Sequence, residues 1–299
     1  MKPPLVTICT PVYNGERYLR ESIESSVDQT WPAVEVVVVD DASTDSTPGV
    51  LKAFGDSIRV VTLRTNGGYA NAVNTAIRSS RGDFLVFNNA DDRLERDMVQ
   101  RHAEALSSFK EASITYSDFL QIDAEGEERN RVRTPDFPNH HALRRAIAKS
   151  CFLSLGSAMV RRRVFDTVGL LDVENSHSAD WEFWTRALAV FPARHLPGFL
   201  ARYRVHGQQN SLQSNAMERC RQLTRARVAR SYPFAIWFPS WISHHRDVWS
   251  EIRWNARTAN RGLAWAAGAP MRDLVGFAKA LGRTTRWAPA RLHGSSGQG

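Results

Sequence analysis

Acidic and amide side chains follow two separate apolar segments in the first third of this 299-residue chain. Asp40 and Asp41 end one segment, and Asn89, Asp91 and Asp92 follow another. Carboxylate and amide oxygens accept hydrogen bonds from ribose hydroxyls and nucleobase N–H groups. They are also the ligands that Mg²⁺ and Mn²⁺ prefer. The two clusters together predict a cleft that binds a nucleotide and a divalent metal ion bridging its diphosphate.

Each cluster also has a purely structural interpretation. An aspartate pair at a strand end commonly serves turn chemistry, and Asp92 is placed to cap a helix that begins near Asp97. Asn66, Gly67 and Gly68 precede another predicted helix, whose N-terminal N–H groups could face a phosphate. A glycine pair alone does not establish a phosphate site. The order of all the motifs along the chain is needed to choose between a nucleotide-binding cleft and ordinary turn and cap chemistry.

The elements that must position these residues alternate regularly. β-branched or apolar runs predict strands at 5–10, 35–39, 59–63 and 84–87. Periodic apolar stripes predict helices at 17–28, 47–54, 69–80 and 98–109. This alternation predicts an α/β fold with a mostly parallel sheet flanked by helices, in which ligands bind at the carboxyl ends of the strands. Polar motif residues follow all four strands, which favours a common cleft over scattered turns.

The second half of the chain is less regular. Residues 118–149 are polar and contain Pro135 and Pro138, which predicts an irregular excursion. Later elements are expected as helices at 163–168 and 180–190 and a strand at 199–205. We therefore expect a catalytic domain over 1–217, with the donor site in 1–117 and the acceptor part in 118–217. A basic, Trp-rich helical region over 218–299 follows it and ends in a disordered tail.

Bulk composition narrows the class of protein. Hydrophobic residues make up 42% of the chain, enough for a substantial core. No apolar run of membrane-spanning length and no signal-type segment occurs, so a cytoplasmic catalytic part is expected. Cys9, Cys151 and Cys220 are odd in number and lack metal-ligand spacing, which predicts reduced, buried thiols.

The net charge of +8 is concentrated after residue 218. Arginines interleaved with tryptophans there predict a peripheral contact with an anionic membrane surface, and no nucleic acid partner is expected. A solvated helical face is the alternative.

The first strand–helix turn excludes one common class of nucleotide-binding protein. Thr10-Pro-Val-Tyr-Asn-Gly15 stands there in place of the Gly-x-Gly-x-x-Gly pattern, which argues against a dehydrogenase. The ordered set of motifs instead resembles the family 2 glycosyltransferases of the GT-A fold over roughly residues 5 to 212. Its members are Thr10-Pro-Val-Tyr-Asn14, Val39-Asp-Asp-Ala-Ser-Thr-Asp45, Asn66-Gly-Gly68, Asn89-Ala-Asp-Asp92, Ala179-Asp-Trp-Glu182 and Tyr203-Arg-Val-His206.

The resemblance implies inverting transfer of a sugar from a nucleoside-diphosphate sugar, most simply a UDP-sugar, to an acceptor hydroxyl. It implies Mn²⁺ or Mg²⁺ as cofactor, a glycan or lipid-linked acceptor, and a role in bacterial cell-surface polysaccharide synthesis. Asp91 and His206 become the expected metal ligands, although a histidine satisfied within the fold is the alternative for His206, and Arg204 could be a surface residue. The expected nucleotide-sugar site consists of Pro11, Tyr13, Asp40, Asp41, Gly68, Asn89 and Ala90.

Asp180 is the expected general base, on position as well as likeness. It opens a helix whose apolar stripe of Trp181, Trp184 and Leu188 can pack inward, and the helix dipole favours an ionised carboxylate in the first turn. Glu182, two residues further along, should point to a different side. A role for Asp180 as a helix cap alone is the structural alternative.

Three positions depart from the family pattern. Asn89 stands where the first aspartate of the metal motif is usual, Ala179 replaces an acid before the base, and Val73 replaces a basic residue. These departures keep a catalytically silent nucleotide- or carbohydrate-binding module open as an alternative. A nucleotidyltransferase is a second alternative, although the glycine- and lysine-rich phosphate loop of such enzymes is missing from this N-terminus.

Overall fold

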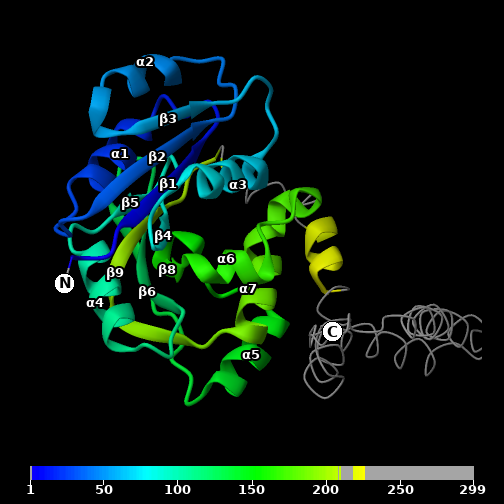
Figure 1. The fold of residues 1–299 in the computed structure, drawn as a ribbon. Helices are drawn as coiled ribbons and strands as arrows, with labels where there is room; N and C mark the ends of the chain where they lie inside the picture. The colour runs from blue at the N-terminus through cyan, green and yellow to red at the C-terminus, as the bar shows by residue number, and fades with distance from the viewer. Residues whose placement is uncertain (1, 208, 210–217, 226–299) are drawn as a thin grey trace, which may run out of the picture. The chain divides into compact units, whose positions relative to one another are not determined.

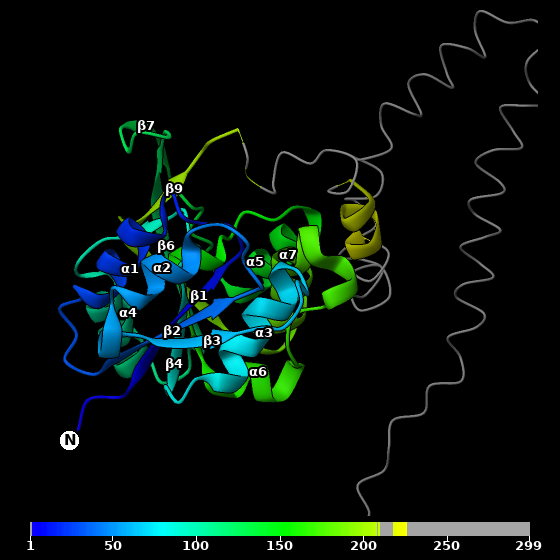
Figure 2. The same cartoon turned by 90° about the horizontal axis from the view of Figure 1, so that it is seen from above.

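The computed structural model describes residues 2–207, 209 and 218–225. Within these residues one sheet has the strand order β3-β2-β1-β4-β8-β6-β9-β5, and β7 pairs with β6. Figure 1 shows the sheet with helices packed around it, and Figure 2 shows α1, α2 and α4 on one side and α3, α6 and α7 on the other. The mixed α/β architecture predicted from the sequence is confirmed.

The first half contains the alternating elements that were predicted. They are β1 (Val6–Val12), α1 (Leu19–Val27), β2 (Val34–Asp40), α2 (Thr47–Lys52), η1 (Gly55–Ser57), β3 (Arg59–Thr62), α3 (Tyr69–Ser79), β4 (Phe84–Phe87), β5 (Arg93–Leu94) and α4 (Met98–Ser108). Strand β1 pairs in parallel with β2 and β4, and β2 pairs in parallel with β3. The carboxyl ends of these four strands therefore lie at one edge of the sheet.

The second half adds mostly antiparallel pairs. Its elements are β6 (Ile114–Ile122), β7 (Glu128–Val132), α5 (His140–Lys149), η2 (Leu155–Ser157), β8 (Ala158–Arg161), α6 (Arg162–Val168), η3 (Val173–Ser178), α7 (Ala179–Val190) and β9 (Ala193–Arg204). Strand β8 runs antiparallel to both β4 and β6, and only the β6–β9 pair of this half is parallel. Residues 218–225 form a further helical segment, and the rest of the predicted C-terminal region lies outside the described residues.

The expectation of an irregular excursion over 118–149 is wrong, because this stretch holds most of β6, all of β7 and all of α5. Polar residues inside β6 concealed the strand pattern. The Asp118 carboxylate is buried and accepts hydrogen bonds from Thr134 N at 2.9 Å and from His195 Nε2 at 2.9 Å. Pro135 and Pro138 precede α5 without breaking it, and Asn139 caps that helix by accepting from Ala142 N at 2.9 Å.

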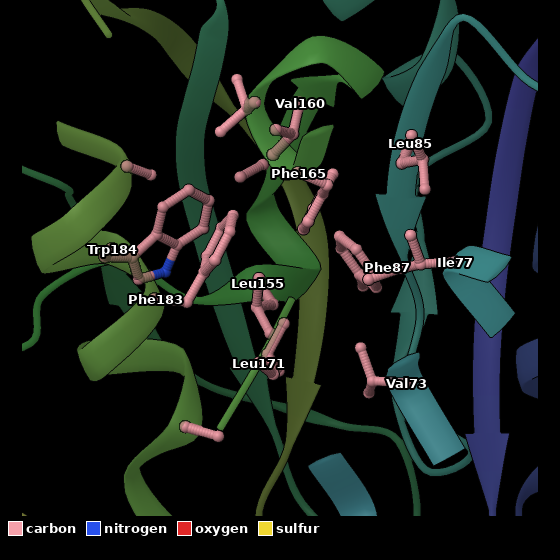
Figure 3. Close-up of a cluster of buried hydrophobic side chains, with 14 of the residues drawn as sticks. Val73, Ile77, Leu85, Phe87, Leu155, Val160, Phe165, Leu171, Phe183 and Trp184 are labelled. Atoms are coloured by element: carbon pink, nitrogen blue, oxygen red, sulfur yellow. The ribbon is translucent and has the colours of Figure 1, made fainter. Parts of the chain in front are cut away.

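Alternate residues of the central strands feed two separate cores. Val36 and Val38 pack with α1 and α4, whereas Val37 and Val39 face α3. Figure 3 shows the second core, where Val73 and Ile77 of α3 and Leu85 and Phe87 of β4 approach the aromatic residues of α6 and α7.

An aromatic stack in this core fixes the start of α7. The rings of Phe165 and Phe183 are parallel to within 8°, with centroids 4.8 Å apart, and Trp184 is fully buried beside them. Burying a ring of this size contributes about 1.5 to 3 kcal/mol. Asn74 of α3 adds two hydrogen bonds to Leu171, at 2.7 Å to its carbonyl oxygen and 2.9 Å from its N–H. The helix that carries Asp180 is thus tied to the parallel half of the sheet.

The three cysteines are free thiols, but only two are buried. Cys9 and Cys220 are enclosed as predicted, whereas Cys151 is exposed, so the expectation of burial is wrong there. Cys151 follows the C-terminus of α5, where the chain turns along the surface. None of the helices in the described part of the chain is long and apolar enough to cross a membrane.

Candidate active site

The turns after β1 and β2 are tied together by side chain–backbone hydrogen bonds. Asn14 has a left-handed φ of 50°, and its side-chain oxygen accepts from Thr44 N at 2.8 Å. Asp40 is buried and accepts from Ser43 N at 3.0 Å, which is the turn chemistry considered for it. Pro11 is buried near the end of β1, and Tyr13, the first residue after this strand, is 50% exposed. The predicted base and ribose residues therefore share one edge of the sheet.

Asp41 orders the glycine loop before α3. Its two carboxylate oxygens accept from Gly67 N and from Gly68 N, each at 2.8 Å. Gly68 adopts a φ of 82° as the residue that precedes α3, a conformation that favours glycine. The sequence placed Asp41 and Gly68 in one nucleotide site, and the structure brings them into contact through hydrogen bonds that the sequence did not predict.

The loop after β4 is anchored on α1. Asn88 is fully buried and donates to Ser22 O at 3.0 Å and to Ser26 Oγ at 2.9 Å. Ser22 Oγ donates in turn to Asn89 O at 2.8 Å. Ala90 lies close to Gly15 in the turn after β1. The space beside Gly15 is so limited that a Cβ there would be 3.4 Å from the Ala90 Cβ. These contacts hold Asn89, Ala90 and Asp91 at the carboxyl edge of the sheet.

Asp91 and His206 come together from positions far apart in the sequence. The Nε2 atom of His206 lies 3.0 Å from Oδ2 of Asp91, and the His206 ring packs against Tyr18 with centroids 5.0 Å apart. Asp92 is buried beside them and accepts from Arg204 N at 2.9 Å. Burial, followed by the neighbouring Asp91 charge, raises the pKa of Asp92 well above its usual value.

Asp91 and His206 are hydrogen-bonded to each other, which is the satisfied histidine considered as the alternative, and their spacing also fits two ligands of a divalent metal ion. Ligands at right angles around an ion such as Mg²⁺ lie about 3 Å apart, which matches the separation of these two atoms. No group of three or more His, Cys, Asp or Glu side chains suited to a metal gathers anywhere in the described residues. Phosphate oxygens and water would complete such a site, as they do for ions that dehydrate reluctantly.

Arg204 is not the surface residue that the sequence allowed. Its side chain is 1% exposed, and the guanidinium donates to Asp91 O at 2.9 Å and to Glu21 Oε2 at 2.8 Å. It also donates to the carbonyl oxygens of Asp123 and Ala124 at 3.2 and 3.1 Å. Arg204 therefore holds the metal-motif loop, the start of α1 and the β6–β7 turn at one point.

Tyr69 is a site residue that sequence reasoning missed. Its hydroxyl donates to Asn89 Oδ1 at 3.1 Å. Burial raises the pKa of Tyr69 far above its usual value, and the charges of Asp180, Asp92 and Asp91 raise it further. The hydroxyl is therefore a neutral donor close to both the metal motif and Asp180. Its position directly after the Gly-Gly pair could have indicated a site residue. In the sequence, however, Tyr69 marked only the start of a predicted helix.

Asp180 lies half-buried in the first turn of α7. Its Oδ1 accepts from Trp181 N at 2.7 Å, and Cys151 Sγ lies 4.0 Å from Oδ2. Burial raises the pKa of Asp180, although the Trp181 N–H opposes the shift. Glu182 is committed elsewhere, because Arg186 donates to its two carboxylate oxygens at 2.7 and 2.8 Å. The two acids therefore have different hydrogen-bond partners, and the assignment of the base to Asp180 stays a prediction.

The two other departures from the family pattern are buried apolar residues. Val73 is 0% and Ala179 is 1% exposed, and both belong to the core cluster between α3 and α7. Val73 replaces a basic residue and Ala179 replaces an acid, so neither position places an unpaired charge in that core. An isolated charge there would be costly.

Solved structures define the class of fold. The chain superposes with a TM-score of 0.62 on TarS of Staphylococcus aureus in complex with UDP-GlcNAc, at 18% identity, covering 76% of this chain and 70% of that one. It superposes with a TM-score of 0.63 on the mannosyltransferase PcManGT of Pyrobaculum calidifontis in complex with GDP-Man and Mn²⁺, at 22% identity, covering 95% and 82%. The fold is that of GT-A transferases.

Sequence comparison gives the family. Residues 7–169 match the family model described as glycosyl transferase family 2, and the chain belongs to this family. An uncharacterised glycosyltransferase of Rickettsia felis is 29% identical over 232 residues, which are 74% of this chain and 37% of the relative. The putative teichuronic acid biosynthesis glycosyltransferase TuaG of Bacillus subtilis is 26% identical, covering 71% of this chain and 82% of that protein. The chain spans 37% to 66% of the length of the Rickettsia felis and Rickettsia typhi relatives.

Proposed function

We propose that this glycosyltransferase moves a sugar from a nucleoside-diphosphate sugar to an acceptor hydroxyl, with inversion and with a divalent metal ion. The meeting of Asp91 with His206 at 3.0 Å, at a point close to Tyr69 and Asp180, carries the proposal. The similar proteins that bind UDP-GlcNAc, or GDP-Man with Mn²⁺, support this substrate class and this cofactor.

The chain's own residues would divide the work between donor and acceptor. Pro11, Tyr13 and the loop ordered by Asp41 would hold the nucleotide, and Asp91 with His206 would hold Mn²⁺ or Mg²⁺. The ion, when bound, neutralises the charge that develops on the leaving diphosphate.

Asp180 would take the proton of the attacking hydroxyl. Burial raises its pKa, which makes the Asp180 carboxylate a stronger base than that of a surface aspartate. Attack opposite the leaving group inverts the anomeric carbon, and the two sites contribute chiefly by orienting the substrates.

The expected substrates follow the same reasoning. We propose a UDP-sugar donor, which the likeness to TarS in complex with UDP-GlcNAc supports, and a glycan or lipid-linked acceptor on the cytoplasmic side of the membrane. The likeness to TuaG, named for teichuronic acid biosynthesis, supports a role in a cell-surface polysaccharide. Apart from residues 218–225, the basic, Trp-rich stretch proposed to contact an anionic membrane lies outside the described residues.

Metal-dependent donor binding tests the proposal. Calorimetry with UDP and with GDP, in Mn²⁺ and in EDTA, is expected to show binding that Mn²⁺ strengthens in the wild type. Asp91→Ala should lose about 10-fold or more of the Mn²⁺-dependent affinity, a loss typical of a disturbed metal site. Asn89→Ala should lose less, because an amide supplies no charge.

Asp97→Ala is the matched control, since Asp97 is an exposed aspartate six residues further along the chain with only a 3.9 Å contact to Arg101. Equal wild-type affinity in Mn²⁺ and in EDTA would defeat the metal assignment. Slow hydrolysis of the bound sugar nucleotide with Mn²⁺ is expected of an enzyme, whereas a silent module would leave the sugar nucleotide intact.

A further inference from the structure

Tyr69 links the helix after the glycine loop to the loop of the metal motif. It is the first residue of α3, and its hydroxyl donates to Asn89 Oδ1 at 3.1 Å. Its ring packs against the core between α3 and α7, which leaves the hydroxyl at the end of a side chain with little freedom. A phenol can accept a hydrogen bond as well as donate one, so the Tyr69 oxygen keeps acceptor capacity for a ligand.

The Asn89 side chain is fixed at both ends of its amide. Its Nδ2 donates to Asp92 Oδ2 at 2.8 Å, while its Oδ1 accepts from Tyr69. Asp92 is itself held by Arg204 N at 2.9 Å. Rotation of the amide would break two hydrogen bonds at once, so the chain Tyr69–Asn89–Asp92 sets one orientation. Among the described residues, the second N–H of the Asn89 amide makes no hydrogen bond and is free to donate to a ligand.

This arrangement explains why a neutral residue stands at position 89. An aspartate there would place a second carboxylate within hydrogen-bonding distance of Asp92, which is buried and 5% exposed. Like charges so close in a buried site are strongly unfavourable. Asn89 removes the repulsion and supplies the donor that Asp92 accepts, and Tyr69 supplies the donor that the amide oxygen accepts. Asn89, which departs from the family pattern, and Tyr69 are therefore linked, because Tyr69 supplies the donor that the Asn89 amide oxygen accepts.

The surroundings of this pair are acidic. Asp92 Oδ2 accepts from the Asn89 amide at 2.8 Å, Asp91 lies two residues further along the same loop, and Asp180, Asp92 and Asp91 all raise the pKa of Tyr69. Arg204 is directed elsewhere, because its guanidinium is occupied by Glu21 and by three carbonyl oxygens. A negatively charged group on the transferred sugar would meet carboxylates here, whereas an uncharged hydroxyl can donate to one group and accept from the other.

We propose that Tyr69 and Asn89 form one recognition unit for an uncharged hydroxyl of the donor sugar, with Tyr69 positioning the Asn89 amide. This inference rests on the proposed nucleotide-sugar function and adds the class of sugar, a neutral hexose in preference to a uronic acid. Tyr69 acts here as a determinant of specificity, and the proton transfer is left to Asp180.

Removal of the single hydroxyl tests the unit. Calorimetry in Mn²⁺ compares each nucleoside diphosphate with its sugar nucleotide, using UDP with UDP-glucose and GDP with GDP-mannose. Tyr69→Phe keeps the ring and should weaken the sugar nucleotide by about 3- to 10-fold, the range for one hydrogen bond, while leaving the diphosphate within about 2-fold. Wild type should also bind UDP-glucose at least about 10-fold more tightly than UDP-glucuronate, and this gap should narrow in Tyr69→Phe.

Tyr116→Phe is the matched control, because it removes another phenol hydroxyl, bonded to Pro135 O at 3.2 Å, away from this loop. Melting temperatures of both variants show whether a loss comes from unfolding. Unchanged sugar-to-diphosphate ratios in Tyr69→Phe, or tighter binding of UDP-glucuronate than of UDP-glucose, would overturn the recognition unit alone. A wild type that binds no nucleotide in Mn²⁺ would overturn the proposed function and this inference with it.

Discussion

The proposed donor half (residues 1–117) and the proposed acceptor half (residues 118–217) of the domain position their candidate site residues in different ways. In the proposed donor half, Asn14 and Asp41 lie in turns after parallel strands and Asp40 is the last residue of β2, and each accepts a hydrogen bond from a backbone N–H of these turns or of the glycine loop. In the acceptor half, Asp180 sits at the start of a helix whose place is set by the stacked rings of Phe165 and Phe183. Geometry of the first kind is local, whereas geometry of the second kind depends on a whole core.

The two halves meet at Arg204, the last residue of β9. The β9 strand belongs to the late part of the chain, yet the Arg204 side chain binds α1 and the loop after β4. His206, two residues further, then reaches Asp91. The proposed donor site is formed by turns from the first half of the domain and completed by residues at the end of β9. A substitution that destabilises either half is therefore expected to weaken donor binding.

The largest expected effect is a loss of turnover in the acceptor half, and it distinguishes the proposed base from a neighbouring acid that supports the helix. Asp180→Asn keeps the shape and the hydrogen bond from Trp181 N but cannot take a proton, so turnover should fall by about 10²- to 10⁴-fold with donor affinity unchanged. Glu182→Gln should keep near-normal turnover and lose stability, because the bidentate pair with Arg186 is weakened. Steady-state kinetics and calorimetry measure both quantities.

The pH profile sharpens this prediction. Burial raises the pKa of Asp180, so the wild-type rate should decline on the acid side at a higher pH than an exposed aspartate would give. The limb should vanish in Asp180→Asn. Near-normal turnover in Asp180→Asn, or a far larger loss of turnover in Glu182→Gln, would show that Asp180 is not the general base.

A smaller effect is expected where the halves join. Arg204→Met keeps much of the side-chain volume but leaves three carbonyl oxygens and Glu21 without their donor, which should lower the free energy of unfolding by about 3 kcal/mol. Urea denaturation measures this loss. Donor affinity should fall as well, since the Asp91 loop loses its support.

Arg202→Met is the control for this variant, because Arg202 lies two residues earlier in β9 and pairs with Glu95 at 2.6 Å in a partly exposed site. Such a pair is worth about 1 kcal/mol or less. Similar losses for both variants would show that Arg204 has no special place between the halves.

The smallest expected effect tests whether the acceptor half can be loosened without the donor site. Asn139→Ala removes the hydrogen bond to Ala142 N that caps α5 and should cost about 1 kcal/mol of stability. Metal-dependent diphosphate binding should remain as in wild type. Asn130→Ala, on the exposed strand β7, should change neither quantity. A donor affinity that falls along with the cap would contradict the independence of the two halves.

Much of the donor half could be predicted from the sequence because its signals are local. Valine-rich runs bounded by acidic turns mark β2, and the periodic stripe of Leu19 and Ile23 marks α1. Strand β6 could not be predicted, since the partners of Asp118 lie at Thr134 and His195. A buried polar residue looks like a loop residue until its partners are known. Exposure of Cys151 was likewise a matter of where the chain turns after α5.

By itself, the sequence determined the alternating elements, the polar residues at their carboxyl ends and the position of Asp180 in a first helical turn. Tertiary structure alone decided that His206 meets Asp91, that Arg204 is buried, and that Tyr69 donates to Asn89. The reason is physical. Local patterns reflect the burial and backbone preferences of neighbouring residues, whereas each of these contacts joins segments separated by 20 to 183 residues and exists only once the sheet has brought them together.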